Sequence, residues 1–237
     1  MKIGWNAGML LVLALSLSAC GGGGGGQSIN KPRLRYVNAS PDVNPLTYLI
    51  DGSIKTTGIS YLGISPSFVE EDAQEYDVAV REDGELSDLD SIVAGFENDK
   101  EYLVCVAGLK NFGSEFVKRL RLVTPQIDLT TPNGNKSRIY VFHAFLRSSG
   151  LDTPNIDLRN PGDNPQYKVE NIAFASTGNL TIDSSTQTFV ARRNDSESVY
   201  ATQTFTFAPG GIYLAIVAGV EGQVGVQAPK IEFIKLN

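Results

Sequence analysis

His143 is the only imidazole in the chain, so any acid/base or triad chemistry that needs histidine must use it. No Gly-x-Ser-x-Gly sequence supplies a hydrolase nucleophile. The chain contains an internal repeat, in which the counterpart of His143 is Asn38. Both residues follow a strand-like run, and we expect both side chains to hydrogen bond to turn backbone, with a general-base role for His143 as the alternative.

The two cysteines lie in different settings. Cys105 falls in the apolar run Tyr102 to Gly108, without an adjacent charge to lower its pKa. We expect a buried thiol that packs as a small apolar side chain rather than a reactive group. Cys20 ends an apolar N-terminal run. One histidine and two cysteines are also too few for a clustered zinc site.

Carboxylates are concentrated in two segments: Glu70-Glu71-Asp72, and a loop that contains Asp83, Glu85, Asp88 and Asp90. Oxygen-rich loops suit Ca²⁺, but Asp83-Gly84-Glu85 lacks the ligand spacing of an EF-hand. Glycoside hydrolysis needs two carboxyl groups about 5–9 Å apart on rigid elements, whereas these lie in predicted turns. We interpret them as solvated loops, with calcium binding as the alternative, and predict no other metal and no cofactor.

The overall charge narrows the choice of partners. A formal net charge of −6 and an isoelectric point near 4.9 do not suit nucleic-acid binding, which requires a basic face. Most aromatic residues fall in strand patterns, so we expect them in a core rather than on a sugar-stacking surface; examples are Tyr36, Phe96, Tyr102, Phe205 and Tyr213.

The elements that must position these residues have the period of strands. Short runs rich in β-branched and aromatic residues are separated by Gly, Asn, Asp and Pro, and predict strands at 33–37, 76–81, 103–107, 117–123 and 138–142. Without helical periodicity, this favours an all-β sandwich or small barrel. The run from Tyr102 to Gly108 is apolar on both faces and predicts a central strand, whereas Val117 to Val123 alternates with basic residues and predicts a half-exposed one.

Internal repetition divides the chain after the N-terminal segment. Tyr102-Leu103-Val104-Cys105-Val106-Ala107-Gly108 matches Tyr213-Leu214-Ala215-Ile216-Val217-Ala218-Gly219, a numbering difference of 111. The same difference pairs Phe96 with Phe207 and Arg81 with Arg192, and it continues without a gap to Leu120 and Ile231. We therefore predict two tandem β-sandwich (Ig-like) modules, at 31–129 and 136–237.

Upstream of that stretch the second copy carries extra residues. Arg33 to Ala39 lies over Arg138 to Ala144, and Pro45 lies over Pro154, with the smaller differences of 105 and 109. The polar stretches Ser148 to Thr153 and Asn160 to Pro165 contain the turn-forming residues typical of loops. We expect the extra residues there.

The N-terminus resembles a bacterial lipoprotein signal peptide. Met1-Lys2 starts the chain, Met9 to Leu17 is an apolar run too short to span a bilayer, and Leu17-Ser18-Ala19-Cys20 resembles a lipobox. The resemblance implies a signal peptide at 1–19, and diacylglycerol and palmitate-type acyl chains on Cys20, which anchor the protein in a membrane. The glycines in 20–30 predict a flexible linker, and Gly21 resembles the residue after the cysteine in lipoproteins sorted to the outer membrane.

The first copy also resembles a bacterial extracytoplasmic repeat family of unknown function, whose units open Val-Arg-x-x-His-Ala-Ser-Pro-Asp. Arg35-Tyr36-Val37-Asn38-Ala39-Ser40-Pro41-Asp42 carries the match, with Asn38 where the family has His. The second copy keeps His143-Ala144 and has Phe145-Leu146-Arg147 instead of Ser-Pro-Asp. The resemblance implies tandem β-sandwich-like modules outside the cytoplasm and implies no activity.

Two functions remain as hypotheses. The favoured one is a non-catalytic envelope module, periplasmic or surface-exposed, that presents loops or an edge strand to an envelope protein or a glycan, with Ser40, Pro41 and Asp42 as a possible binding loop. The alternative is an envelope hydrolase with a site between the two modules that uses Asp42, Asp157 or His143. Fold alone does not decide between them, because sandwiches host both.

Overall fold

The structure is a computed structural model, and it describes residues 30–148, 153–194 and 196–237. The signal peptide, Cys20 and the glycine tract lie outside these residues. The described chain is all-β: its strands form four sheets, and its only helical elements are two single 3₁₀ turns. Within the described ranges, no helix has the length and apolar character needed to cross a membrane.

The first half of the chain supplies two sheets. The strands are β1 (Arg33–Asn38), β2 (Leu46–Ile50), β3 (Ser53–Ile59), β4 (Val69–Glu70), β5 (Glu75–Glu82), β6 (Asp90–Gly95), β7 (Glu101–Ala107), β8 (Arg121–Val123) and β9 (Gln126–Ile127), with the 3₁₀ turn η1 (Phe116–Lys118) before β8. One sheet has the order β4-β1-β7-β8, with β9 also on β7, and the other has the order β3-β2-β5-β6.

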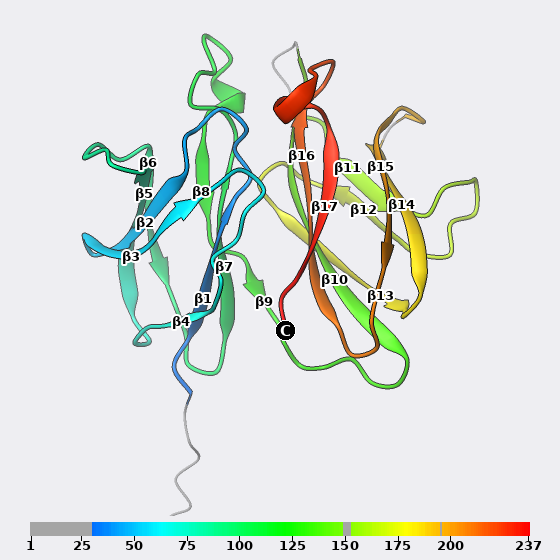
Figure 1. Cartoon of the computed structure of the whole chain (residues 1–237), viewed down its shortest axis with the longest axis horizontal. Helices are drawn as coiled ribbons and strands as arrows, with labels where there is room; N and C mark the ends of the chain where they lie inside the picture. The colour runs from blue at the N-terminus through cyan, green and yellow to red at the C-terminus, as the bar shows by residue number, and fades with distance from the viewer. Residues whose placement is uncertain (1–29, 149–152, 195) are drawn as a thin grey trace, which may run out of the picture.

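The second half repeats this plan. Its strands are β10 (Lys136–Leu146), β11 (Ile156–Arg159), β12 (Lys168–Ile172), β13 (Thr177–Asp183), β14 (Thr186–Arg193), β15 (Val199–Thr206), β16 (Ile212–Val220) and β17 (Lys230–Lys235), with the 3₁₀ turn η2 (Gly225–Gln227) before β17. The sheet orders are β13-β10-β16-β17 and β12-β11-β14-β15, so every sheet takes its strands from one half only. The predicted β-sandwich fold is confirmed, and Figure 1 shows the two sandwiches side by side.

Each sandwich has its own apolar core because successive side chains of a strand point to opposite faces. In the first core Tyr36 and Tyr48 are fully buried, with ring centroids 5.1 Å apart. In the second core Phe207 and Phe233 are buried, and Phe205 packs partly exposed against both of them. Of the five aromatic residues predicted to be in a core, four are buried; they are Tyr36, Phe96, Tyr102 and Tyr213.

A third apolar cluster, here called the seam, lies between the two sandwiches. The alternate residues of β1 and β7, such as Val37, Leu103 and Cys105, face Phe142, Leu214 and others of β10 and β16. This explains why the central strands are apolar on both faces: one face packs in its own sandwich and the other packs in the seam. Burying apolar area of this kind contributes about 25 cal/mol per Å² removed from water, so the seam holds the two halves as one body.

Polar groups also cross the seam at its edges. The Arg35 guanidinium donates to the carbonyl oxygens of Ser65 and Leu236, at 2.9 and 3.1 Å. Lys230 lies 5.2 Å from the ring centroid of Tyr61, which belongs to the other half. The Arg35–Leu236 hydrogen bond and the Lys230–Tyr61 cation–π contact thus join the two sandwiches, and the hydrogen bond adds a directional constraint to the apolar packing.

The strand register supports the internal repeat in the centre of each sandwich and corrects it at the end. Arg33 pairs with Glu101 in the parallel pair β1 and β7, and Arg138 pairs with Ile212 in the parallel pair β10 and β16, which preserves the differences of 105 and 111. In the last strands Val106 pairs with Leu122, whereas Val217 pairs with Ile231. Leu122, and not Leu120, is therefore the counterpart of Ile231, and the prediction of an ungapped match to that point is wrong by two residues.

The segment Val117 to Val123 is also not the single half-exposed strand predicted from its alternation. Residues 116–118 form η1, and only 121–123 form a strand. Lys118, expected in solvent, is 1% exposed, and its ammonium lies 2.7 Å from a Glu115 carboxylate oxygen. The chain turns here because the Leu109 amide donates to the Lys118 carbonyl and the Leu109 carbonyl accepts the Leu120 amide, which closes the loop after β7 on itself.

Candidate functional site

The turn after β1 is held by its own polar side chains. Asn38 is fully buried; its amide donates to the Ile59 carbonyl at 3.0 Å, and its oxygen accepts from the Ser40 amide at 3.0 Å. The Ser40 hydroxyl donates to the Gly108 carbonyl at 2.7 Å. The Asp42 carboxylate accepts two backbone amides from the loop after β7. The prediction that Asn38 satisfies turn backbone is confirmed.

Asp42 and its counterpart Arg147 carry opposite charges and have different kinds of partner. The two oxygens of Asp42 accept the backbone amides of Lys110 and Asn111, at 2.9 and 2.8 Å. In the second half the strand does not turn but continues to Leu146, and the Arg147 guanidinium lies 3.6 Å from a carboxylate oxygen of Glu221. Glu221 is the counterpart of Lys110, so these two positions carry opposite charges in the two halves, although the Lys110 ammonium pairs with Glu82 rather than with Asp42.

The loops that follow β7 and β16 adopt matching shapes. Gly108 and Gly219 have φ of +103° and +107°, a region that favours glycine. A Cβ at these positions would lie 2.4 Å from the Arg119 carbonyl oxygen and 2.5 Å from the Ala228 carbonyl oxygen. Both glycines therefore allow the returning segment to pass against the end of the strand, and each loop then forms its 3₁₀ turn.

Residues of these loops line an open groove. The 3₁₀ turns of the two loops, green and red, lie at the upper end of the molecule in Figure 1. The groove has a volume of about 340 Å³. The first half contributes Asp42, Leu109, Asn111, Glu115 and Lys118. The second half contributes Arg147, Ser148, Val220, Gln223 and Gln227. Two carboxylates and two cations thus line a solvent-open site that neither half forms alone.

His143 does not reach this groove. Its side chain is fully buried, edge-on to the ring of Phe174 with centroids 5.7 Å apart, and neither ring nitrogen has a hydrogen-bond partner among the described residues. Burial lowers its pKa to about 3, so the imidazole is neutral. The prediction that His143 satisfies turn backbone as Asn38 does is therefore wrong: its backbone makes those contacts, with Ala175 and Ser176, and its ring makes none.

Asp157 lies elsewhere again. It is 2% exposed on β11, on the face of its sheet that points away from the core residues Ile156 and Leu158. One carboxylate oxygen accepts the Asn171 amide at 2.9 Å, and the other lies 3.4 Å from Arg192. The three residues named for a hydrolase therefore occupy three separate environments, and only Asp42 lines the groove.

The remaining predicted groups take individual structural roles. Cys105 is fully buried, as predicted, and burial raises the pKa of its thiol far above the usual value. It lies in the seam, in the same apolar cluster as its counterpart Ile216. In the acidic loop, Asp83 accepts the Thr47 hydroxyl at 2.8 Å, while Asp90 accepts the Leu122 amide at 2.8 Å. Among the described residues no group of three or more acidic, histidine or cysteine side chains is placed to hold a metal ion.

Part of the groove was visible in the sequence. Asp42 belongs to the predicted binding loop, but its neighbours Ser40 and Pro41 are buried and offer no surface to a ligand. Sequence reasoning missed Lys118, Gln223 and Gln227, which share no motif. The signal that could have identified Arg147 is the repeat itself, because it aligns Arg147 with Asp42 and Glu221 with Lys110.

No protein-family model and no curated protein matches this sequence. Among solved structures, the Bacillus anthracis TIE protein is 11% identical over 80% of this chain and 34% of its own, with a TM-score of 0.26. The present chain thus spans about a third of that protein. A family 26 carbohydrate-binding module of Eubacterium rectale Amy13K, solved with maltoheptaose, is 12% identical over 87% of this chain and 97% of its own, with a TM-score of 0.26.

A DUF3823-family protein of Bacteroides ovatus is 9% identical over 75% of this chain and 98% of its own, with a TM-score of 0.21. At such identities and scores these likenesses carry no argument about function. A functional assignment therefore rests on the geometry of the groove and the chemistry of its side chains.

Proposed function

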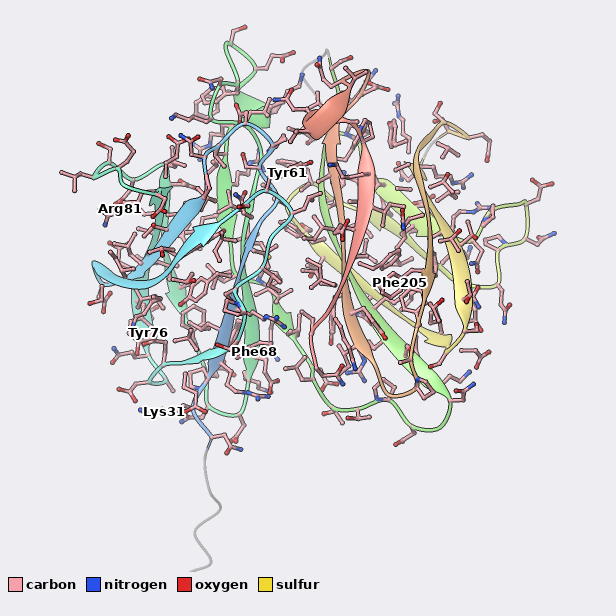
Figure 2. All side chains as sticks on the ribbon, in the orientation of Figure 1. Lys31, Tyr61, Phe68, Tyr76, Arg81 and Phe205 are labelled. Atoms are coloured by element: carbon pink, nitrogen blue, oxygen red, sulfur yellow. The ribbon has the colours of Figure 1, made fainter. Side chains whose placement is uncertain are left out.

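We propose that this chain is a lipid-anchored protein of the bacterial cell envelope that binds a partner, a protein or a glycan, without catalysis. The observation that carries the proposal is the groove, which both halves form jointly at the end of the molecule opposite Lys31. Lys31, near the start of the described chain, lies at the other end of the molecule (Figure 2).

The anchor part of the proposal rests on the sequence around Cys20 and on its resemblance to a lipobox. We assign the chain to the outer membrane on the same ground, and assign its modules to the repeat family that the first copy resembles, with boundaries at 31–129 and 136–237. The acidic character of the chain, with a formal net charge of −6 over the full sequence, suits this place, because an anionic membrane surface would repel it.

The non-catalytic part rests on where the reactive groups lie. His143, Cys105 and Asp157 are all buried, and the Asp42 carboxylate is occupied by two backbone amides. Catalysis needs a base or nucleophile that reaches the substrate at hydrogen-bond distance. The groove instead offers polar side chains from loops of both halves, which a binding site can use.

Membrane attachment is tested by metabolic labelling and fractionation of cells that express the full chain. Wild type should incorporate labelled palmitate and sediment with outer membranes, and Cys20→Ala should do neither. Sedimentation of Cys20→Ala with the membranes, at the level of wild type, would contradict the lipid anchor.

Partner binding is tested by crosslinking on intact cells. The double variant Gln223→Ala with Gln227→Ala removes two groove side chains, and Gln203→Ala on β15 is a matched control outside the groove. We expect one partner to be recovered with wild type and the control and lost with the groove variant. Turnover of a glycan or ester that His143→Ala abolishes, in a chain that stays folded, would instead establish the hydrolase.

A further inference from the structure

The charges of the groove are already paired within the protein. Lys118 is held by Glu115 at 2.7 Å, Asp42 by two backbone amides, and Arg147 lies 3.6 Å from Glu221. A charged ligand would have to compete with these partners, and its own charge would meet equal numbers of carboxylates and cations. The groove therefore favours an uncharged ligand over a phosphate, a uronate or a basic peptide.

The groups that remain for a ligand are neutral and can both donate and accept hydrogen bonds. The side chains of Asn111, Gln223 and Gln227 make no hydrogen bond to another described residue, and Ser148 adds an exposed hydroxyl. A carboxamide donates and accepts at once, as does a hydroxyl. A ligand with many hydroxyl groups matches this set, because each hydroxyl can both accept and donate.

The groove also supplies apolar contacts beside its polar groups. Leu109 and its counterpart Val220 line it, and the same two loops expose Phe116, Val224 and Val226. A sugar ring presents C–H faces between its hydroxyls and can use both kinds of surface. A peptide added to a sheet would need a free strand edge, whereas loop side chains line this groove.

We propose that the groove binds a neutral oligosaccharide that lies across the seam and contacts both halves. The inference deepens the proposed binding function and rests on it. The volume of about 340 Å³ is at the small end of the range for ligand sites, about 300–1,000 Å³, so a short segment of the glycan would be enclosed while the rest lies in solvent.

The test is calorimetric titration of the full lipidated chain, held in a detergent without a sugar headgroup. The probes are short neutral gluco-, manno- and galacto-oligosaccharides, together with uronate and phosphorylated oligosaccharides of matched length. We expect binding of at least one neutral series. The double variant Gln223→Ala with Gln227→Ala should weaken it at least about tenfold, since it removes the hydrogen-bonding groups of two carboxamides, and Gln203→Ala should leave it unchanged.

Salt separates the neutral ligand from a charged one. Affinity for a neutral sugar should stay constant between about 50 mM and about 500 mM NaCl, whereas ion pairing would be screened over that range. Tighter binding of the charged probes than of the neutral ones would overturn the inference. If no sugar binds but the groove variant still loses its partner on cells, the sugar inference is overturned and the binding function stands. If no sugar binds and the groove variant does not change partner capture on cells, the binding function is overturned as well.

Discussion

The turn after β1 and the equivalent stretch of β10 begin alike and are stabilised differently. In the first half Asn38, Ser40 and Asp42 each bond to a nearby backbone group, and the strand ends. In the second half His143 stands in the position of Asn38 without a hydrogen bond from its ring to any described residue, and the strand continues to Leu146. At the same place in the fold, the second half thus uses backbone strand pairing where the first half uses side-chain hydrogen bonds. The Ser-Pro-Asp sequence of the first half therefore stabilises the turn.

The strand continues because its partner continues with it. Phe145 and Leu146 pair with Gly219 and Val220 of β16, whereas β7 ends at Ala107. Leu146 then packs in the seam, so the longer strand adds apolar contact between the halves. The end of the first half is thus stabilised by side-chain hydrogen bonds, and the end of the second half by buried apolar surface.

The largest expected effect tests whether the two loops are equivalent. Gly108→Ala and Gly219→Ala should each lower the free energy of unfolding by about 3 kcal/mol, because a Cβ would meet backbone and the φ values are positive. Gly84→Ala is the matched control: its φ is +83° but nothing lies within 4 Å of its Cβ, so about 1 kcal/mol is expected. Chemical denaturation measures all three. Unequal effects of Gly108→Ala and Gly219→Ala would break the equivalence of the loops.

The next effect contrasts Asn38 with His143. Asn38→Leu should cost about 2–3 kcal/mol, because it leaves the buried Ser40 amide and Ile59 carbonyl without a partner. His143→Phe removes a buried polar ring that bonds to none of the described residues, so it should leave stability within about 1 kcal/mol of wild type or raise it. Equal losses for the two variants, measured by urea denaturation, would mean that the imidazole has a hydrogen-bonding role after all.

A third effect comes from the pKa of His143, about 3 in the folded protein and 6.5 when exposed. Between these values the unfolded chain binds a proton that the folded chain refuses, so stability falls as the pH falls below 6.5. The expected loss is about 2 kcal/mol at pH 5, and it is absent above pH 7. The difference between wild type and His143→Phe isolates this contribution from that of the carboxylates. A pH-independent difference between the two proteins would show that the ring is not buried as a neutral group.

The sequence predicted the strands that carry apolar residues, and the fold class with them. The double-sided apolar pattern of Tyr102 to Gly108 indicated a central strand but not what covers its second face, since the seam needs residues about a hundred positions apart. Lys118 was expected in solvent because alternation cannot register a 3₁₀ turn, in which the chain folds back and covers its own lysine. The His143 side chain was expected to hydrogen bond to turn backbone because its counterpart Asn38 can do so. Whether a ring nitrogen has a hydrogen-bond partner depends on side-chain geometry, which residue spacing does not determine.

For the candidate site, the sequence predicted one residue of the groove, Asp42, and a function class. The rest of the groove comes from loops brought together by the seam, so no local motif contains them. Charge reversal between the halves is the one long-range signal that was present, because Arg147 and Glu221 stand where Asp42 and Lys110 stand.

The smallest expected effect concerns that reversed pair. Arg147 and Glu221 are partly exposed and 3.6 Å apart, so a double-mutant cycle with Arg147→Ala and Glu221→Ala should give a coupling of less than about 1 kcal/mol. Raising the salt concentration should reduce it further, because exposed charges are screened. A coupling of several kcal/mol, measured by thermal or urea unfolding, would mean that the ion pair stabilises the end of the second half as strongly as the buried turn stabilises the end of the first half. A small coupling would instead mean that the second half is closed at this end by strand pairing and buried surface, whereas Asp42 closes the first half through its two amides.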